Sequence, residues 1–185
     1  MTRINSKQLG AVLFSVIMVT SMFVGVITLT STDVVRADEA APLEPGPVTE
    51  AGVIEEPGVY KLQNDIDLGG QAIAAFEIKS SDVVLDGNGY TISNGTSEAI
   101  HILASGSNTA LENVTVTDLT ITNTETAISA MNVKNSDFTD LQLVSNNDAG
   151  LVFAGDNGAN NVVDTVLFQD NEKGIFMREG TSGMT

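Results

Sequence analysis

The chain has 185 residues, of which 24 are acidic and 8 are basic, and its formal net charge is −16. A surface of this sign repels nucleic acid and anionic lipid, so we expect neither as a partner. Because the chain has no cysteine, disulfide bonds are excluded and packing must hold the fold together.

The first 37 residues have the pattern of an export signal. Arg3 and Lys7 precede an uncharged stretch from Gln8 to Thr32, and Ala37 is the last residue before the acidic part. A basic start, an apolar centre and small residues at a cleavage point are typical of a secretory signal peptide. The same stretch is long enough to span a bilayer as an uncleaved anchor helix. Both alternatives place the rest of the chain outside the cell, either secreted or at the cell surface.

Residues 38–52 are acidic and contain three prolines. This composition predicts an extended, solvated linker. The folded domain is expected over residues 53–185. Its first part, residues 53–74, is expected to be an N-terminal cap that protects the end of the domain from edge pairing.

A short motif returns every 23 to 28 residues through this domain. A small residue is followed by an apolar one, and a second apolar or small residue comes two places on. The motif begins at Ala75, Ala99, Ala127, Gly150 and Gly174. Such a period indicates one supersecondary unit stacked on itself. Runs rich in β-branched residues, such as Val114–Ile121, separate the motifs and predict strands, while no stretch has the apolar spacing of a convincing helix.

Each β-branched run closes on a polar turn. Asn and Asp accept the left-handed backbone conformation of a tight corner and bond nearby backbone groups. Stacked coils would place these residues above one another, so we predict a structural ladder at one corner. Its members are Asn94, Asn123, Asn146 and Asp170.

Two strings carry a family resemblance: Glu56–Leu62 followed by Asn64–Ile66, and Val84–Ile92. With these strings the chain resembles the right-handed parallel β-helix proteins, particularly the NosD-like and carbohydrate-associated β-helix repeat family, over residues 53–185. The resemblance implies an all-β fold, a right-handed parallel β-helix (solenoid) of about four to five coils, which here would follow the N-terminal signal or anchor helix.

The acidic residues are spread through every repeat, and lysine is scarce. From Asp38 onward the chain has 23 acidic and 5 basic residues, a net charge of −18. Such a surface is expected of a protein kept soluble in very high salt, where charge repulsion is screened. We interpret it as haloarchaeal, and the plainer alternative is an acidic secreted protein.

Few residues offer metal chemistry. His101 is the single histidine of the sequence, and the alternation with its neighbours turns it outward. NosD-like relatives are associated with copper delivery, and copper favours clusters of His, Met or Cys. Here His101, Met131, Met177 and Met184 are spread over several coils. The string Asp86–Gly89 is explained better by a β-turn than by a calcium loop, so we predict no metal and no cofactor.

Carboxylates are abundant, and many β-helices that resemble this chain cleave acidic polysaccharides. Two sets were candidates for alignment across coils: Asp118, Asp140 and Asp164, and Asp82, Asp137 and Asp156. Such chemistry also needs an acid and base pair or a basic residue. The exported part offers Lys61, Lys79, Lys134, Lys173 and Arg178. No string matches the catalytic motifs of the hydrolases, so we predict no catalytic residue.

Two further features concern the surface. Tyr60 and Tyr90 are the tyrosines that a sugar ring could stack on, whereas the phenylalanines are expected in the core: Phe76, Phe138, Phe153, Phe168 and Phe176. Glycosylation acceptors occur at Asn94 and Asn113. Asn113 is the better candidate, because Asn94 is also a ladder residue.

We therefore expect a secreted or cell-surface module with a binding or scaffolding role and no catalysis, directed at extracellular polysaccharide or envelope proteins. The alternatives are a carbohydrate-active lyase or hydrolase, or a shortened relative of one, and a NosD-like metal-delivery protein. The fifth coil begins at Gly174 and the sequence stops at Thr185. We expect an open edge there, through truncation or as a surface for self-association.

Overall fold

A computed structural model describes residues 41–104 and 109–178. The described chain winds into a parallel β-solenoid of about five turns, with no helix, so the predicted all-β stacked architecture is confirmed. The predicted signal or anchor segment, residues 1–37, lies outside the described residues, as does the start of the predicted linker.

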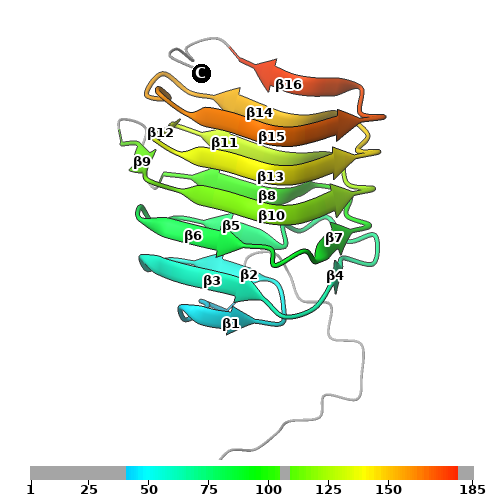
Figure 1. Ribbon diagram of the computed structural model, residues 1–185, viewed down its shortest axis with the longest axis horizontal. Coiled ribbons are helices and arrows are strands. Elements are labelled where there is room, and N and C mark those ends of the chain that lie inside the picture. Colours follow the sequence, from blue (N-terminus) through cyan, green and yellow to red (C-terminus); the bar gives the residue numbers. More distant parts are fainter. Residues whose placement is uncertain (1–40, 105–108, 179–185) are drawn as a thin grey trace, which may run out of the picture. The chain divides into compact units, whose positions relative to one another are not determined.

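Each turn contributes to two long sheets (Figure 1). Sheet A contains β2 (Gly52–Ile54), β5 (Phe76–Ile78), β8 (Glu98–Leu103), β11 (Thr126–Met131), β14 (Ala149–Ala154) and β16 (Lys173–Met177). Sheet B contains β1 (Gly46–Val48), β3 (Gly58–Leu62), β4 (Ile66–Asp67), β6 (Val83–Asp86), β7 (Thr91–Ser93), β10 (Thr115–Thr122), β13 (Asp137–Val144) and β15 (Val162–Gln169). A small third sheet pairs β9 (Leu111–Glu112) with β12 (Val133–Lys134).

The repeated motif lies in sheet A with the predicted alignment. The residue after each small residue is in register through the stack: Phe76, Ile100, Ile128, Leu151 and Ile175. Because side chains alternate along a strand, these residues and those two places on point inward. The small residues leave room for large neighbours; an ideal Cβ on Gly150 would lie 2.6 Å from Cδ1 of Phe168.

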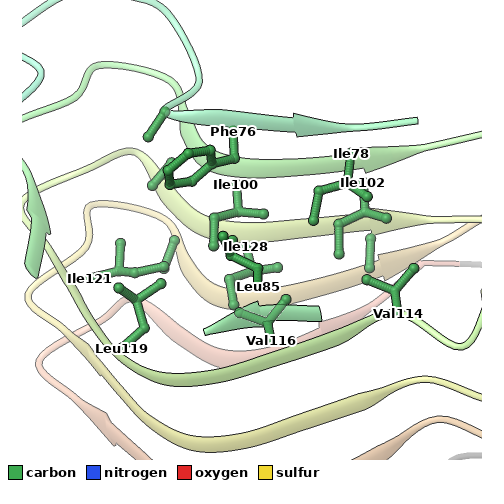
Figure 2. Close-up of a cluster of buried hydrophobic side chains, with 14 of the residues drawn as sticks. Phe76, Ile78, Leu85, Ile100, Ile102, Val114, Val116, Leu119, Ile121 and Ile128 are labelled. Carbon is green, nitrogen blue, oxygen red and sulfur yellow. The ribbon is translucent and has the colours of Figure 1, made fainter. Parts of the chain in front are cut away.

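The core lies between the two long sheets. Inward side chains from sheet A meet those from sheet B (Figure 2), and the ten labelled residues are at most 2% exposed. They are Phe76, Ile78, Ile100, Ile102 and Ile128 from sheet A, and Leu85, Val114, Val116, Leu119 and Ile121 from the facing wall. Near the C-terminal coils the rings of Phe138 and Phe153 pack edge to face, with centroids 5.4 Å apart. This apolar stack is the main stabilising feature of a fold without disulfides.

The long strands of sheet B bend at one residue. Asp118 of β10, Asp140 of β13 and Thr165 of β15 have φ between 51° and 55°, in the left-handed region. In the turn before β10, the strand is divided instead: β6 pairs with the first half of β10 and β7 with the second half. An ideal Cβ on Gly87, between β6 and β7, would lie 2.4 Å from the carbonyl oxygen of Asp118. The close approach of these two backbones therefore requires glycine.

The folded region begins earlier than the composition indicated. β1 lies within residues 38–52, the predicted linker, and pairs in parallel with β3, while Val48 is 3% exposed. Pro47 is compatible with β1 because this strand is at the end of sheet B, where a missing N–H is tolerated. Residues 53–74, the predicted cap, contain β3 and β4, which are in register with β6 and β7. In the described structure this segment is thus an ordinary coil of the solenoid.

Candidate functional site

One corner of the solenoid follows the second half of the sheet B strands. Four residues occupy the same position there in successive turns and share a left-handed backbone, with φ between 53° and 61°: Asn94, Asn123, Ser145 and Asp170. Asn94 donates from Nδ2 to Oδ1 of Asp67 in the turn below, at 3.0 Å. These residues form the outer row of the corner.

A second row lies one residue further along the chain and points inward. Asn146 is 1% exposed, and its Oδ1 accepts from the backbone N–H of Thr124 at 3.1 Å and from its hydroxyl at 2.8 Å. Nδ2 of Asn146 donates to the carbonyl of Ile121 at 3.3 Å, and its backbone N–H donates to Oδ1 of Asn171 at 2.9 Å. Asn171 in turn donates to the carbonyl of Leu143. Buried Thr124 and Asn146 and half-buried Asn171 thus form an inner ladder that joins three turns.

The observed corner differs from the predicted ladder at one member. Asn94, Asn123 and Asp170 share the outer row, whereas Asn146 belongs to the buried row. The reason is that the turns differ in length: the outer row advances from Asn123 to Ser145 and then to Asp170, in steps of 22 and 25 residues rather than the assumed 23 and 24.

The opposite end of the sheet B strands has a second corner, which the sequence analysis did not predict. Its outer row has φ between 51° and 59° and contains Asp82, Asn113, Asn135 and Asn160. Its inner row contains buried Ser136 and Asn161, and Ser136 N–H donates to Oδ1 of Asn161 at 3.1 Å. The signal was present as pairs of adjacent polar residues directly before β13 and β15, Asn135-Ser136 and Asn160-Asn161.

The two candidate glycosylation residues lie in these outer rows. Asn94 and Asn113 are both exposed and both left-handed. Each already donates a side-chain hydrogen bond to an aspartate of the turn below, Asn113 to Asp82 at 2.8 Å. Glycosylation at either position stays a prediction.

All four lysines of the described region are engaged by carboxylates. Lys61 contacts Asp86 at 2.5 Å, Lys134 contacts Glu112 at 2.9 Å, and Lys79 contacts Glu77 at 2.6 Å. Lys173 contacts Asp148 and Glu172. Three of these lysines bridge successive turns, so the scarce bases are used between stacked coils. Each pair is partly exposed and contributes little stability on its own.

The two carboxylate sets considered for catalysis are only partly brought together. Asp118 and Asp140 occupy the same position in adjacent strands, but Asp164 is aligned with Thr139, one residue away. In the second set, Asp82 lies in the outer corner row while Asp137 is in β13. Among the residues that the structure describes, no group of three or more His, Asp or Glu side chains could hold a metal ion.

The aromatic and histidine side chains are placed as follows. His101 is half-buried on the outward side of β8, as alternation predicts. Tyr60 is fully buried and donates its hydroxyl to the carbonyl of Glu56 at 2.9 Å, and burial raises its pKa, so it is not a sugar-stacking residue. Phe176, predicted in the core, is instead aligned with Val152 at an outward position, where the Lys173 ammonium lies 5.4 Å from its ring centroid.

The outer surface of sheet B is mostly polar. We call the outward side chains of β6, β7, β10, β13 and β15 the B face. Its polar members are Asp86, Thr91, Ser93, Thr115, Thr117, Asp118, Thr120, Thr122, Asp137, Thr139, Asp140, Gln142, Asp164, Thr165 and Gln169. Its apolar members are Val84, Val144, Val162 and Leu167. Equivalent positions repeat at the strand spacing of about 4.8 Å, and Thr139 Oγ1 donates to Thr117 Oγ1 at 3.1 Å.

One carboxylate at the first corner has a clear pKa shift. The backbone N–H of Gly69 and the Nδ2 of Asn94 both donate to Asp67 and lower the pKa of its carboxyl. Because the folded pKa is depressed, the stabilisation is present above the unfolded value of about 3.9 and is lost as pH falls through the folded pKa. We expect Asn94→Gly to raise the Asp67 pKa, measured by carboxyl carbon NMR. An unchanged Asp67 pKa would contradict this assignment.

The excess of acidic residues leads to a prediction about salt. With a net charge of −16 and the lysines already paired, the remaining carboxylates repel one another at low ionic strength. We expect the midpoint of thermal unfolding, followed by far-ultraviolet circular dichroism, to be higher in molar salt than in dilute buffer. Sodium chloride and potassium chloride should act alike if screening is the cause. A midpoint independent of salt would contradict the salt-adapted interpretation.

The fold and its surface define the class as a parallel β-solenoid with polar corner ladders. Searches of family models, curated proteins and solved structures give no match to this chain. Within residues 41–104 and 109–178, no helix is long and apolar enough to cross a membrane.

Proposed function

We propose that this chain is a secreted or cell-surface module that binds neutral polysaccharide through the B face and has no catalytic role. The observation that carries the proposal is the B face itself, where fifteen of nineteen outward positions are polar and seven are threonine. These side chains are half-buried or exposed. They present hydrogen-bonding groups in rows at fixed spacing.

The chemistry of the B face favours one class of ligand. Hydroxyl and amide groups both donate and accept hydrogen bonds, as the hydroxyls of a sugar do. Four aspartates on the same face would repel an acidic polysaccharide: Asp118, Asp137, Asp140 and Asp164. The B face has no aromatic side chain, so affinity would come from many weak contacts along an extended chain. A repeating polymer suits such a surface better than a small molecule does.

The handedness of the coil, its family, its origin and its export are part of the same proposal. We infer a right-handed coil and a place among the NosD-like and carbohydrate-associated β-helix proteins, which the repeat and the strings Glu56–Leu62 and Val84–Ile92 support. Haloarchaeal origin is supported by the acidic surface. Export through residues 1–37 is supported by their composition.

Affinity electrophoresis tests this function directly. The full chain is run through gels that contain a neutral glucan, a neutral mannan or acidic alginate. We expect retardation by a neutral polymer and none by alginate. The triple variant T117V/T120V/T139V keeps the shape and strand preference of each residue and removes three hydroxyls of the B face. Since each lost hydrogen bond is worth about 1 kcal/mol, binding should weaken by more than about tenfold.

Thr96 provides a matched control, because it is exposed in a turn outside the B face. Thr96→Val should bind as the unmodified chain does. Equal binding by the triple variant would contradict the role of the B face. Retardation by alginate alone would contradict the choice of a neutral ligand.

A further inference from the structure

The B face is divided by a ridge that crosses its strands. In β10 both Thr117 and Asp118 point outward, which breaks the alternation of the strand. β13 repeats the break at Thr139 and Asp140, and both aspartates have the left-handed φ of the bend. Two successive outward residues make the surface convex at this point. Asp118, Asp140 and Thr165 are exposed in successive strands, so they form the ridge.

A regular strip of outward side chains lies on each side of the ridge. In β10 the strip before the ridge contains Thr115 and Thr117, and the strip after it contains Thr120 and Thr122. The parallel register continues both strips through β13 and β15, and in the other direction to β6 or β7 (Figure 1). Each strip therefore covers four strands at a spacing of about 4.8 Å, but only two outward positions, about 7 Å apart, along each strand.

The ridge restricts the direction in which an extended polymer can lie on the B face. A glycan that followed one strand would have to pass over the exposed carboxylate of Asp118 or Asp140, and the convex bend would lift it from the far strip. A glycan that crosses the strands stays on one strip and meets equivalent positions of successive turns. Thr117 and Thr139 are such positions, and their hydroxyl oxygens lie 3.1 Å apart. The surface therefore favours a chain that crosses the strands.

We propose that the B face binds an extended, β-1,4-linked neutral glycan, one chain in each strip, which crosses the strands with one sugar unit over each turn. This inference rests on the proposed function and adds the linkage and the direction of the ligand. An extended β-1,4-linked chain advances per sugar unit by nearly the strand spacing of about 4.8 Å, so each unit meets the same row of side chains. An α-1,4-linked chain coils and loses this match. Four strands accommodate four sugar units.

Isothermal titration calorimetry of the full chain tests the linkage. Cellotetraose and β-1,4-linked mannotetraose are compared with maltotetraose, which has the same length and an α-1,4 linkage. We expect the better β-1,4 ligand to bind at least tenfold more tightly than maltotetraose, and its disaccharide to bind at least tenfold more weakly than the tetrasaccharide, because two turns are left without contacts.

The outcomes separate this inference from the proposed function. If neutral polymers retard the chain in gels but neither β-1,4 tetrasaccharide binds better than maltotetraose, the linkage is wrong and the proposed function stands. If no neutral polymer retards the chain, the proposed function fails as well.

A nitroxide at the reducing end of the bound tetrasaccharide tests the direction, through the broadening of threonine methyl signals. Thr91 of β7 and Thr165 of β15 lie in the first and last strands of the stack, whereas Thr115 and Thr122 lie at opposite ends of β10. We expect the strongest broadening at Thr91 or at Thr165. Broadening that is strongest at one end of β10 and falls along that strand would overturn the direction.

The double variant D118N/D140N provides a second test of the direction. Asparagine accepts the left-handed backbone of the ridge, so the fold should be kept and the dissociation constant should stay within about twofold. A tenfold change would show that the glycan passes over the ridge and would overturn the proposed arrangement.

Discussion

Replacing Asn146 with alanine should destabilise the fold by roughly 3 kcal/mol, because a buried donor or acceptor without its partner costs about 1–3 kcal/mol. The side chain satisfies the N–H and hydroxyl of Thr124 and bonds the carbonyl of Ile121, and the residue is 1% exposed. Alanine removes all of these bonds and supplies none. Urea unfolding followed by circular dichroism measures the free energy of unfolding.

Asn123 provides the matched control at the same corner. It is exposed and has φ of 54°. Asn123→Gly keeps that backbone conformation accessible and should cost less than about 1 kcal/mol. If the two variants are equally stable, the buried row does not hold the coils together in the way described.

Replacing Phe138 with alanine should cost about 3–5 kcal/mol, the usual range for a buried aromatic ring. Phe138 is fully buried and packs edge to face on Phe153 with centroids 5.4 Å apart. A small domain has only about 5–15 kcal/mol of stability in total. The unfolding midpoint in urea should therefore fall steeply, and the far-ultraviolet spectrum should lose strand signal at moderate temperature.

Phe176→Ala is the informative comparison, because both phenylalanines were expected in the core and Phe176 lies at an outward position. It should cost about 1 kcal/mol, from the loss of its contact with the Lys173 ammonium. Phe138→Leu, which keeps most of the buried volume, should cost less than Phe138→Ala and should fold even if the alanine variant does not. Equal losses for Phe138→Ala and Phe176→Ala would contradict the assignment of inward and outward rows.

The stacked fold could be predicted because it depends on a repeated local pattern. The small residue and the two apolar residues that follow recur at positions such as Ala99 and Ala127, and the register pairs them as expected. The repeat predicts the register because every turn buries the same face against its neighbour. The start of the domain could not be predicted in this way. β1 lies among acidic residues and contains proline, which is the composition of a linker. Its strand conformation depends on pairing with β3.

The details of the corners depend on spacing that the pattern does not fix. Successive turns differ by three residues in length, so Asn146 was aligned with Asn123 although it lies one place further inward. A one-residue shift changes an exposed corner residue into a buried, four-bonded one. Phe176 could not be placed from the sequence for a different reason: Ile175, Phe176 and Met177 are three consecutive large apolar residues, so the pattern does not show which of them point inward. The B face was overlooked because threonine in a strand is ordinary, and its significance depends on alignment across turns.

Methyl NMR of threonine-labelled protein tests polysaccharide binding at the B face most directly. The chain is titrated with the neutral polysaccharide that retards it in the gels, and each threonine methyl signal is assigned by substitution. The proposal predicts that the B-face threonines shift or broaden together, while Thr96 in its turn and buried Thr124 and Thr126 do not. These B-face threonines are Thr91, Thr115, Thr117, Thr120, Thr122, Thr139 and Thr165. Perturbation confined to Thr96, or no perturbation of any threonine on a chain shown to be folded, would contradict it.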